Sequence, residues 1–313
     1  MTWENRLKEL QNGPLRFFLW LLSLLYGAII FLRNAAYDLK LFKTYRLSVP
    51  VISVGNIAVG AMGKTPLVRW LAEDISKTKK VAILSRGYRS QSEHNILRVT
   101  ALTPATLCGD EPLWLAQKLP SVAVWVGKDR VKTGEQAIAE GAEIIILDDG
   151  LQHRRLCRDI EIILVGPPEK YFLPRGWLRD SPRRLKKADL LAGREGLQFE
   201  LRLKADLQGK KVALFCAIGR PERFIESVRQ AGATIVATLL KDDHRSFITE
   251  ELQKFSLQNP GTLLVCTEKD AVKIPSEVKS SLGIQELPAE IFIISGQEKW
   301  KKIYDQRIQS HPS

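Results

Sequence analysis

The chain has 313 residues, 45% of them hydrophobic and 26% charged, which is the balance of a globular protein with room for two domains. Lysine and arginine outnumber the acidic residues by 47 to 35, and the net charge of +12 indicates an acidic partner such as nucleic acid, anionic lipid or a phosphorylated substrate. The four cysteines form no C-x-x-C motif and the four histidines lack metal-ligand spacing, which argues against a zinc site or a disulfide framework.

The first predicted element is an apolar helix near the N-terminus. Residues 17–32 (FFLWLLSLLYGAIIFL) carry no charge and lie between Arg16 and Arg33. At about 1.5 Å per residue the run would cover about 24 Å, less than the roughly 30 Å hydrocarbon core of a bilayer. The composition therefore favours a membrane-associated helix embedded at the interface over a full span, with a cleaved signal peptide and a buried core helix as the alternatives.

Residues 49–75 (VPVISVGNIAVGAMGKTPLVRWLAEDI) combine an apolar strand, a glycine-bearing loop and an amphipathic helix. This context favours a phosphate-binding loop over an ordinary strand-to-helix turn, although Ala58 stands where the Walker pattern has its first glycine. Backbone N–H groups would hold ATP, the ammonium of Lys64 would reach its β- and γ-phosphates, and the Thr65 hydroxyl would bind Mg²⁺. The predicted nucleotide-binding residues, called the phosphate loop below, are Ala58, Val59, Gly60, Ala61, Met62, Gly63, Lys64 and Thr65.

Further apolar, β-branched runs alternate with helical patterns, which is typical of a parallel sheet buried on both faces. They occupy residues 81–88, 121–127, 142–150, 159–166 and 186–193. Around residues 195–210 apolar and polar residues alternate as in a half-exposed ribbon, and the α/β pattern then resumes. We expect a membrane-associated helix in residues 1–34, a P-loop NTPase-like α/β domain in 35–196, and a smaller α/β domain in 197–313 joined by a β-ribbon linker.

Acidic residues at strand ends are the next candidates, because parallel sheets bind ligands at the carboxyl ends of their strands. Asp148 and Asp149 follow a buried run in the position of a Walker B acid that holds Mg²⁺, although an Asp-Asp-Gly turn is the structural alternative. Asp110 precedes a helical pattern and fits an N-cap equally well. His244 lies in a charged run (KDDHR, residues 241–245) that is either exposed or able to accept a hydroxyl proton.

The order of several segments resembles the tetraacyldisaccharide 4'-kinase family, which phosphorylates the lipid A disaccharide precursor. DDGLQHRRLxRDI, found within residues 148–160, is the most specific of them when the others accompany it. The loop has one glycine fewer than the family usually shows, and FLPRGWLRDSP replaces the usual LLPAGPLREP. The segments are SVGNIAVGAMGKTP (53–66), LSRGY (84–88), GDEP (109–112), DR (129–130), ILDDGLQHRRLCRDIEI (146–162) and CTEKDAVK (266–273).

The resemblance implies an ATP-dependent kinase that transfers the γ-phosphate to the 4'-hydroxyl of a tetraacylated glucosamine disaccharide 1-phosphate. It further implies that Asp110 and His244 activate the sugar hydroxyl in a cleft between the domains, and that the protein acts at the cytoplasmic face of the inner membrane. With Mg²⁺ on Thr65 and on Asp148 or Asp149, the expected partners are the lipid A precursor and the membrane, with no nucleic acid or protein partner. The alternative is a membrane-tethered nucleotide switch or adaptor, which would hydrolyse ATP without the lipid.

Overall fold

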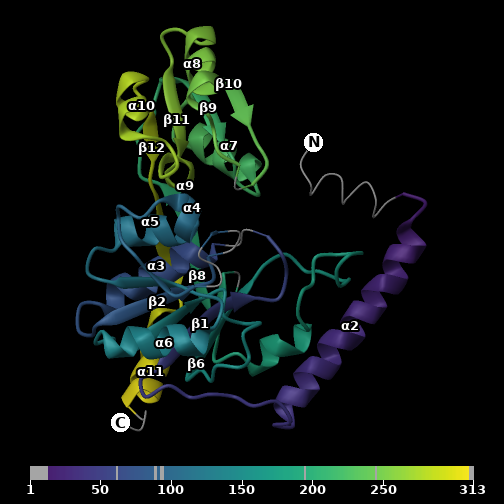
Figure 1. Cartoon of the computed structure of the whole chain (residues 1–313). Coiled ribbons are helices and arrows are strands. Elements are labelled where there is room, and N and C mark those ends of the chain that lie inside the picture. The colour runs from purple at the N-terminus through teal and green to yellow at the C-terminus, as the bar shows by residue number, and fades with distance from the viewer. Residues whose placement is uncertain are drawn as a thin grey trace.

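The computed structural model describes residues 13–60, 63–87, 90–91, 95–193, 195–243 and 245–309. Three residues predicted to lie in the site, Ala61, Met62 and His244, fall outside these ranges. The described part of the chain forms two sheets, each with its own helices, and an N-terminal helix that lies along one flank (Figure 1).

The larger sheet has nine strands in the described part of the chain, in the order β13-β8-β7-β6-β1-β5-β2-β4-β3. Neighbouring strands are parallel except at the two edges, where β3 and β13 run antiparallel to their partners. The central strands β1 and β5 are buried along their whole length, as their largely apolar sequences predict. The strands are β1 (Val51–Asn56), β2 (Val81–Ser85), β3 (Leu97–Val99), β4 (Ala123–Val126), β5 (Ile144–Asp148), β6 (Ile160–Val165), β7 (Leu190–Gly193), β8 (Leu197–Leu203) and β13 (Ala289–Ser295).

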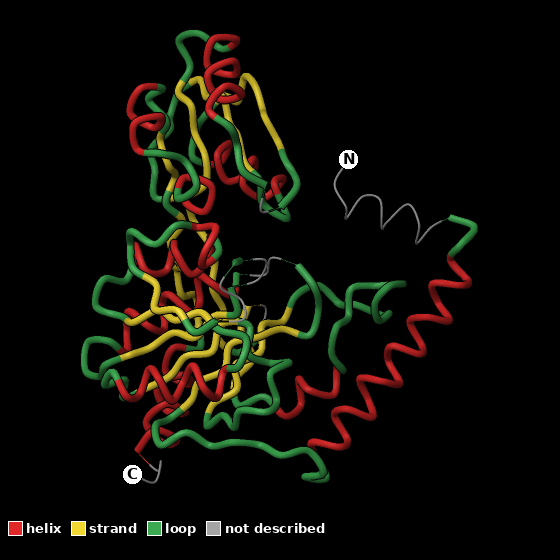
Figure 2. The backbone as a smooth tube through the Cα atoms, viewed as in Figure 1, coloured by secondary structure: helices red, strands yellow, loops and turns green. Residues whose placement is uncertain are grey.

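Helices cover both faces of the large sheet (Figure 2). Successive strand residues point to opposite faces, so Ile52 packs in one core with α3, α5 and α11, whereas Val51 packs in a second core with α6. The result is a three-layer α/β arrangement, and the predicted fold class is confirmed. The helices are α3 (Lys64–Ile75), α4 (Ala105–Cys108), α5 (Asp110–Lys118), α6 (Arg130–Ala139) and α11 (Gln297–Gln309), with the 3₁₀ helix η1 (Pro182–Lys187) before β7.

The smaller sheet is wholly parallel, in the order β10-β9-β11-β12. Helix α7 packs on one of its faces, while α8, α9 and α10 pack on the other. The elements are β9 (Lys211–Cys216), α7 (Pro221–Gln230), β10 (Thr234–Leu240), α8 (Thr249–Gln258), β11 (Leu263–Thr267), α9 (Glu268–Ala271), α10 (Ser276–Ser281) and β12 (Gln285–Leu287).

The sheets do not divide at residue 197, where the sequence places the start of the smaller domain. Strand β8 pairs with β7 in the large sheet and antiparallel with β13, so the chain leaves for the small sheet through β8 and returns through β13. Helix α11 then packs on the large sheet through Trp300. The predicted ribbon is therefore the β8/β13 pair, and its alternating pattern is that of strands at the edge of the large sheet.

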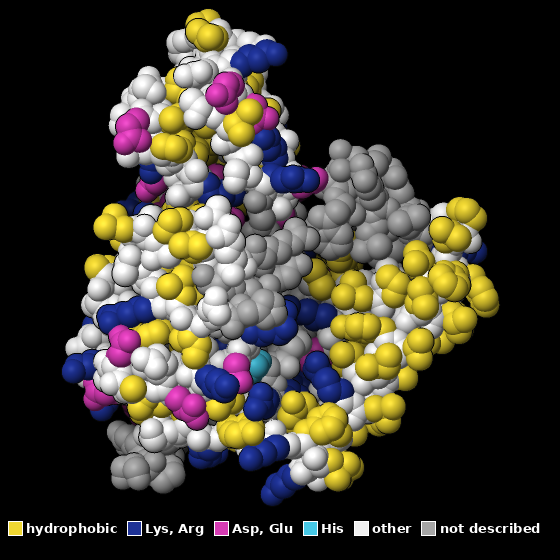
Figure 3. All heavy atoms as spheres, in the orientation of Figure 1, with side chains coloured by type: hydrophobic (Ala, Val, Ile, Leu, Met, Phe, Trp, Pro, Cys, Tyr) yellow, Lys and Arg dark blue, Asp and Glu magenta, His cyan; other side chains and the backbone are white. Residues whose placement is uncertain are grey.

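Helix α2 (Arg16–Asp38) exposes most of its large apolar residues, and its buried residues are Ser23, Ile30 and Asn34. Ser23, Gly27, Ile30 and Asn34 follow one another about a turn apart on the side that meets the protein, where Gly27 lies against the ring of Phe172. This is the reverse of a helix in a water-soluble protein, and α2 is long and apolar enough to cross a membrane. Figure 3 shows the apolar surface along α2; its exposed residues include Phe17, Phe18, Leu21, Leu24, Leu25, Ile29, Phe31 and Leu32.

Candidate active site

The phosphate loop connects the end of β1 to the start of α3, as predicted. Gly63 is the N-cap of α3 and has φ of +87°, a left-handed conformation that glycine adopts without strain. A Cβ added to Gly63 would lie 3.3 Å from the ring of Phe199 in β8, so the position is also tightly enclosed. Gly63 has no side chain that could cap the helix, so the N-cap offers no acceptor to the first-turn N–H groups of Lys64 and Thr65. This geometry can hold an anion.

Lys64 lies in a cluster of charged and polar groups at the carboxyl ends of β1 and β5. Its Nζ donates to Asn56 Oδ1 at 3.0 Å and lies 3.5 Å from Asp149 Oδ1. Arg179 donates to both carboxylate oxygens of Asp149, with Nη1 2.9 Å from Oδ2, and also to Asn56. Burial alone would raise the pKa of Asp149, but Lys64 and Arg179 outweigh it and hold that pKa well below its usual range.

Asp148 and Asp149 are adjacent but differ in environment. Asp148 ends β5 with only 3% of its surface exposed, and its Oδ1 has no hydrogen-bond partner among the described residues. Burial, followed by the charges of Glu111 and Asp149, raises the pKa of Asp148 to about 7. Asp149 has a left-handed backbone with φ of +56° and, as described above, is bound by Arg179. An unpartnered buried oxygen at Asp148 is what a cation would satisfy.

These residues fit Mg²⁺. Within the described ranges, no three His, Cys, Asp or Glu residues are grouped as a complete metal site. Mg²⁺ does not require such a group, because it is usually held by one or two carboxylates together with water and phosphate oxygens. Asp148 supplies an open carboxylate oxygen, and Thr65 supplies a hydroxyl in the first turn of α3.

Asp110 lies at the boundary between the two sheets. It is the first residue of α5, whose N-cap is Gly109, so the alternative that Asp110 is itself the N-cap does not hold. Lys273 Nζ lies 3.4 Å from Asp110 Oδ2 and donates to the carbonyl of Arg245 at 3.1 Å. Lys273 thus brings Asp110 close to a residue that adjoins His244.

A second lysine makes a parallel connection. Lys269, in α9, donates to Glu111 Oε1 at 2.9 Å and lies 3.8 Å from Asp243 Oδ1. Burial would lower the pKa of Lys269, but Glu111 and Asp243 raise it above its ordinary value. Residues on both sides of His244 are therefore tied to the first turn of α5.

The small sheet also approaches the phosphate loop itself. Arg220, directly before α7, places Nη2 3.4 Å from the position that a Cβ on Gly60 would occupy. The guanidinium of Arg220 makes no hydrogen bond within the described residues. Burial raises the pKa of Glu169, and the positive charge of Arg220 opposes that rise. A guanidinium thus faces the loop from the smaller sheet.

Three residues of this site, Asn56, Arg179 and Lys273, are not among those that the sequence predicts. Arg179 falls in a segment whose register resembles the family motif, and Lys273 ends the segment CTEKDAVK. The family resemblance could therefore have indicated both residues. Asn56 is simply the last residue of β1, where the carboxyl-end rule for parallel sheets could have indicated it.

Comparison with known proteins gives one consistent result. A family model described as tetraacyldisaccharide-1-P 4'-kinase matches residues 15–309. The tetraacyldisaccharide 4'-kinase of Chlamydia pneumoniae is 37% identical over 297 residues, which cover 82% of this chain and 81% of the relative. That of Syntrophus aciditrophicus is 34% identical over 362 residues, covering 98% and 96%. A crystal structure of the "apo" form of LpxK from Aquifex aeolicus in complex with ATP is similar with a TM-score of 0.78 and 29% identity, covering 96% of this chain and 99% of that chain.

Proposed function

Since this chain belongs to the tetraacyldisaccharide-1-P 4'-kinase family, we propose that it transfers the γ-phosphate of ATP to the 4'-hydroxyl of a tetraacylated glucosamine disaccharide 1-phosphate, a step of lipid A biosynthesis. The observation that supports this most directly is the meeting of the phosphate loop with the acids at the end of β5. The similar Aquifex aeolicus structure is a complex with ATP. Lysine, acids and an open helix N-terminus are the parts that phosphoryl transfer requires.

The residues 58–65 would bind the phosphates of ATP. The N–H groups at the start of α3 would hold phosphate oxygens, and Lys64 already has its ammonium at the ends of β1 and β5, close to Asp149. Arg220 is placed to add a positive charge from the smaller sheet, because its guanidinium faces Gly60. Positioning and charge neutralisation are the main contributions a protein makes to this reaction.

Asp148 and Thr65 would hold Mg²⁺, with Asp149 beside them. Asp148 is the better direct ligand because its Oδ1 is unpartnered, whereas Arg179 donates to both oxygens of Asp149. When bound, the ion neutralises negative charge on the transferring phosphoryl group. Arg179 and Lys64 keep Asp149 ionised and oriented, so Asp149 would support the site through water or through its neighbours.

Asp110 and His244 would activate the acceptor. The imidazole of His244 would take the proton of the 4'-hydroxyl while the hydroxyl oxygen attacks the γ-phosphorus. Asp110 would orient the imidazole and stabilise the positive charge that the imidazole gains. The contacts of Lys273 and Lys269 support this role, since they bring α5 next to residues that flank His244.

Helix α2 would dock the enzyme on the cytoplasmic face of the inner membrane, where an acceptor with four acyl chains resides. The exposed apolar side of α2 supports this, because exposing so many large apolar side chains to water is unfavourable. We further propose three functional parts: the helix, a kinase domain around the large sheet, and a smaller domain that closes over the site from the other side of the β8/β13 ribbon.

The deciding experiment is a transfer assay with γ-labelled ATP and the disaccharide 1-phosphate in detergent micelles. Label should appear in the lipid only when Mg²⁺ and the acceptor are both present. The matched control acceptor is the same lipid already phosphorylated at the 4' position, which should receive no label. Release of labelled phosphate to water at the same rate with or without the acceptor would contradict the kinase assignment.

A further inference from the structure

One segment of the chain joins the membrane helix to the nucleotide site. Residues 171–181, called the connecting segment here, follow the end of β6 and precede η1, and they run alongside α2 (Figure 1). Ser23 Oγ of α2 donates to the carbonyl of Phe172 at 2.8 Å, and Tyr26 Oη donates to the carbonyl of Arg179 at 3.2 Å. Both contacts use polar groups of a helix whose other side is apolar, so they set where the connecting segment lies on α2.

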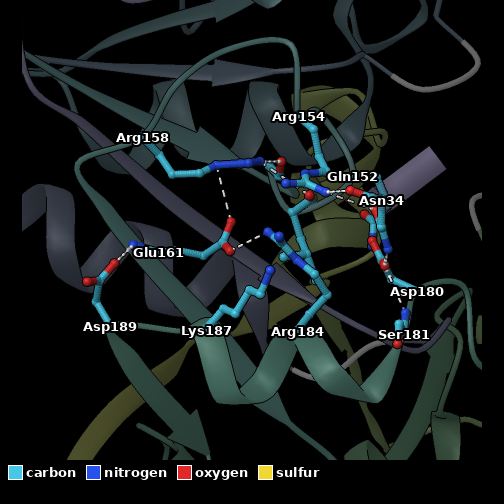
Figure 4. A network of polar contacts seen from close by, with 12 residues as sticks. Asn34, Gln152, Arg154, Arg158, Glu161, Asp180, Ser181, Arg184, Lys187 and Asp189 are labelled. Atoms are coloured by element: carbon cyan, nitrogen blue, oxygen red, sulfur yellow. Dashed lines mark hydrogen bonds and ion pairs between the residues drawn. The ribbon is translucent and has the colours of Figure 1, made fainter. Parts of the chain in front are cut away.

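The strongest attachment to α2 is the carboxylate of Asp180, which is completely buried. Asn34 Nδ2 donates to its Oδ1 at 2.8 Å, and Arg33 Nη2 lies 3.3 Å from its Oδ2. The backbone N–H of Ser181 also donates to Oδ1 at 2.8 Å. Figure 4 shows Asn34 between Asp180 and Arg154, whose Nη1 donates to the Asn34 carbonyl at 2.9 Å.

The burial of Asp180 depends on helix α2. A buried carboxylate is costly unless hydrogen bonds and an opposite charge replace its hydration. The side chains of Asn34 and Arg33 provide both, and each belongs to α2. Without them Asp180 would keep only the Ser181 N–H among the contacts given above, and the segment around it would have to open to water.

The other side of the connecting segment holds the nucleotide site. The backbone N–H groups of Arg179 and Asp180 both donate to the carbonyl of Ile57, at 2.8 and 3.0 Å. Val59 N–H donates to the carbonyl of Trp177 at 2.8 Å, so the first residues of the phosphate loop pair with this segment. The guanidinium of Arg179 then reaches Asp149. The same short stretch therefore binds α2 on one side and the loop with its acid on the other.

We propose that Asp180 is a positioning residue through which membrane helix α2 holds the connecting segment, and with it the phosphate loop and the Arg179–Asp149 pair, in the geometry that binds ATP. The inference rests on the proposed nucleotide site. It predicts that ATP binding depends on α2 even in the absence of lipid. A helix that serves only to dock the enzyme would influence the acceptor and leave nucleotide affinity alone.

The test measures the dissociation constant of ATP in Mg²⁺ buffer with a non-ionic detergent and no acceptor, by calorimetry on the full chain. Asp180→Asn keeps the shape of the side chain but removes its charge, and should weaken ATP binding by about tenfold, the effect of losing one charge-assisted hydrogen bond. Asp180→Glu keeps the charge and should recover most of the affinity.

Tyr26→Phe provides a milder test that should fold in any case. It removes only the hydroxyl bonded to the Arg179 carbonyl, and should weaken ATP binding about threefold. Tyr37→Phe is the matched control on the same helix: Tyr37 packs against Phe42 and Arg154, and its hydroxyl makes no hydrogen bond in the described part of the chain. That variant should bind ATP as the parent does.

The outcomes separate the possibilities. If Tyr26→Phe and Asp180→Asn bind ATP like the parent, or lower only the melting temperature, then α2 is an anchor and the proposal is wrong. If Asp180→Asn does not fold, the comparison of Tyr26→Phe with Tyr37→Phe decides alone. Lys64→Met tests the nucleotide site itself, because an ATP affinity equal to that of the parent would refute that site. If Lys64→Met binds ATP weakly while the Asp180 variants bind it like the parent, only the positioning role is refuted.

Discussion

Replacing Lys64 by methionine tests the centre of the proposed site. Methionine keeps much of the length of the side chain but removes the ammonium, whose Nζ lies 3.0 Å from Asn56 Oδ1 and 3.5 Å from Asp149 Oδ1. Asp149 is 40% exposed on its side chain and keeps both hydrogen bonds from Arg179. The free energy of unfolding should therefore fall by only about 1 kcal/mol.

The catalytic loss should be much larger than the loss of stability. A single preorganised positive group on the transferring phosphate contributes about 3–4 kcal/mol to transition-state stabilisation, so the transfer rate should fall by about 10²- to 10³-fold. The assay is label transfer from γ-labelled ATP to the disaccharide lipid, with urea unfolding measured on the same preparation.

Lys77→Met is the matched control, because Lys77 follows the same helix, is 71% exposed and forms an ion pair with Asp74. That variant should retain parental transfer. A Lys64→Met protein that remains folded and transfers phosphate at more than about a tenth of the parental rate would refute the role assigned to this lysine.

Two further predictions concern other groups of the proposed site, and a third concerns His153, which lies outside it. Asp148→Asn should raise the Mg²⁺ concentration needed for half-maximal transfer or abolish turnover, and an unchanged Mg²⁺ dependence would exclude a metal role. His244→Ala should lower kcat far more than it raises the KM for ATP, so a defect confined to KM would make His244 a structural residue. Burial lowers the pKa of His153 from 6.5 to about 4, and the charges of Arg130 and Arg158 add to this effect. Between these two pH values the unfolded chain binds one proton more than the folded chain, so the free energy of unfolding falls on acidification. Urea unfolding at pH 6.5 and at pH 4 measures this fall in the free energy of unfolding, and His153→Gln should make it smaller by about 3 kcal/mol. An equal fall in the parent and the variant would assign the effect to another group.

The core of the fold could be predicted because its signals are local. Strands β1 and β5 are largely apolar, and such strands stay buried on both faces only between layers of helices. The position of Lys64 followed from a glycine that must turn the chain from a strand into a helix. The acids at the end of β5 could then be expected nearby, because parallel strands bring their carboxyl ends to one edge.

The extent of the large sheet could not be predicted in this way. An alternating pattern over β8 describes a strand with one exposed face, and it is the same for a free ribbon and for a strand at a sheet edge. Pairing with β7 and with β13, which lies more than eighty residues further along the chain, decides between them. Such pairings depend on packing between distant segments, which local periodicity does not encode.

The apolar run of residues 17–32 by itself determined an apolar N-terminal helix, and the GKT tripeptide with its flanking strand and helix determined the loop in which we propose that ATP binds. Only the tertiary structure decided that these two features are joined. Asn34 and Asp180 are far apart in the sequence and no local pattern pairs them, yet they meet in a buried hydrogen bond beside Arg179. Local patterns specify backbone conformation and burial, whereas the partner of a buried polar group is chosen by the packing of the whole chain.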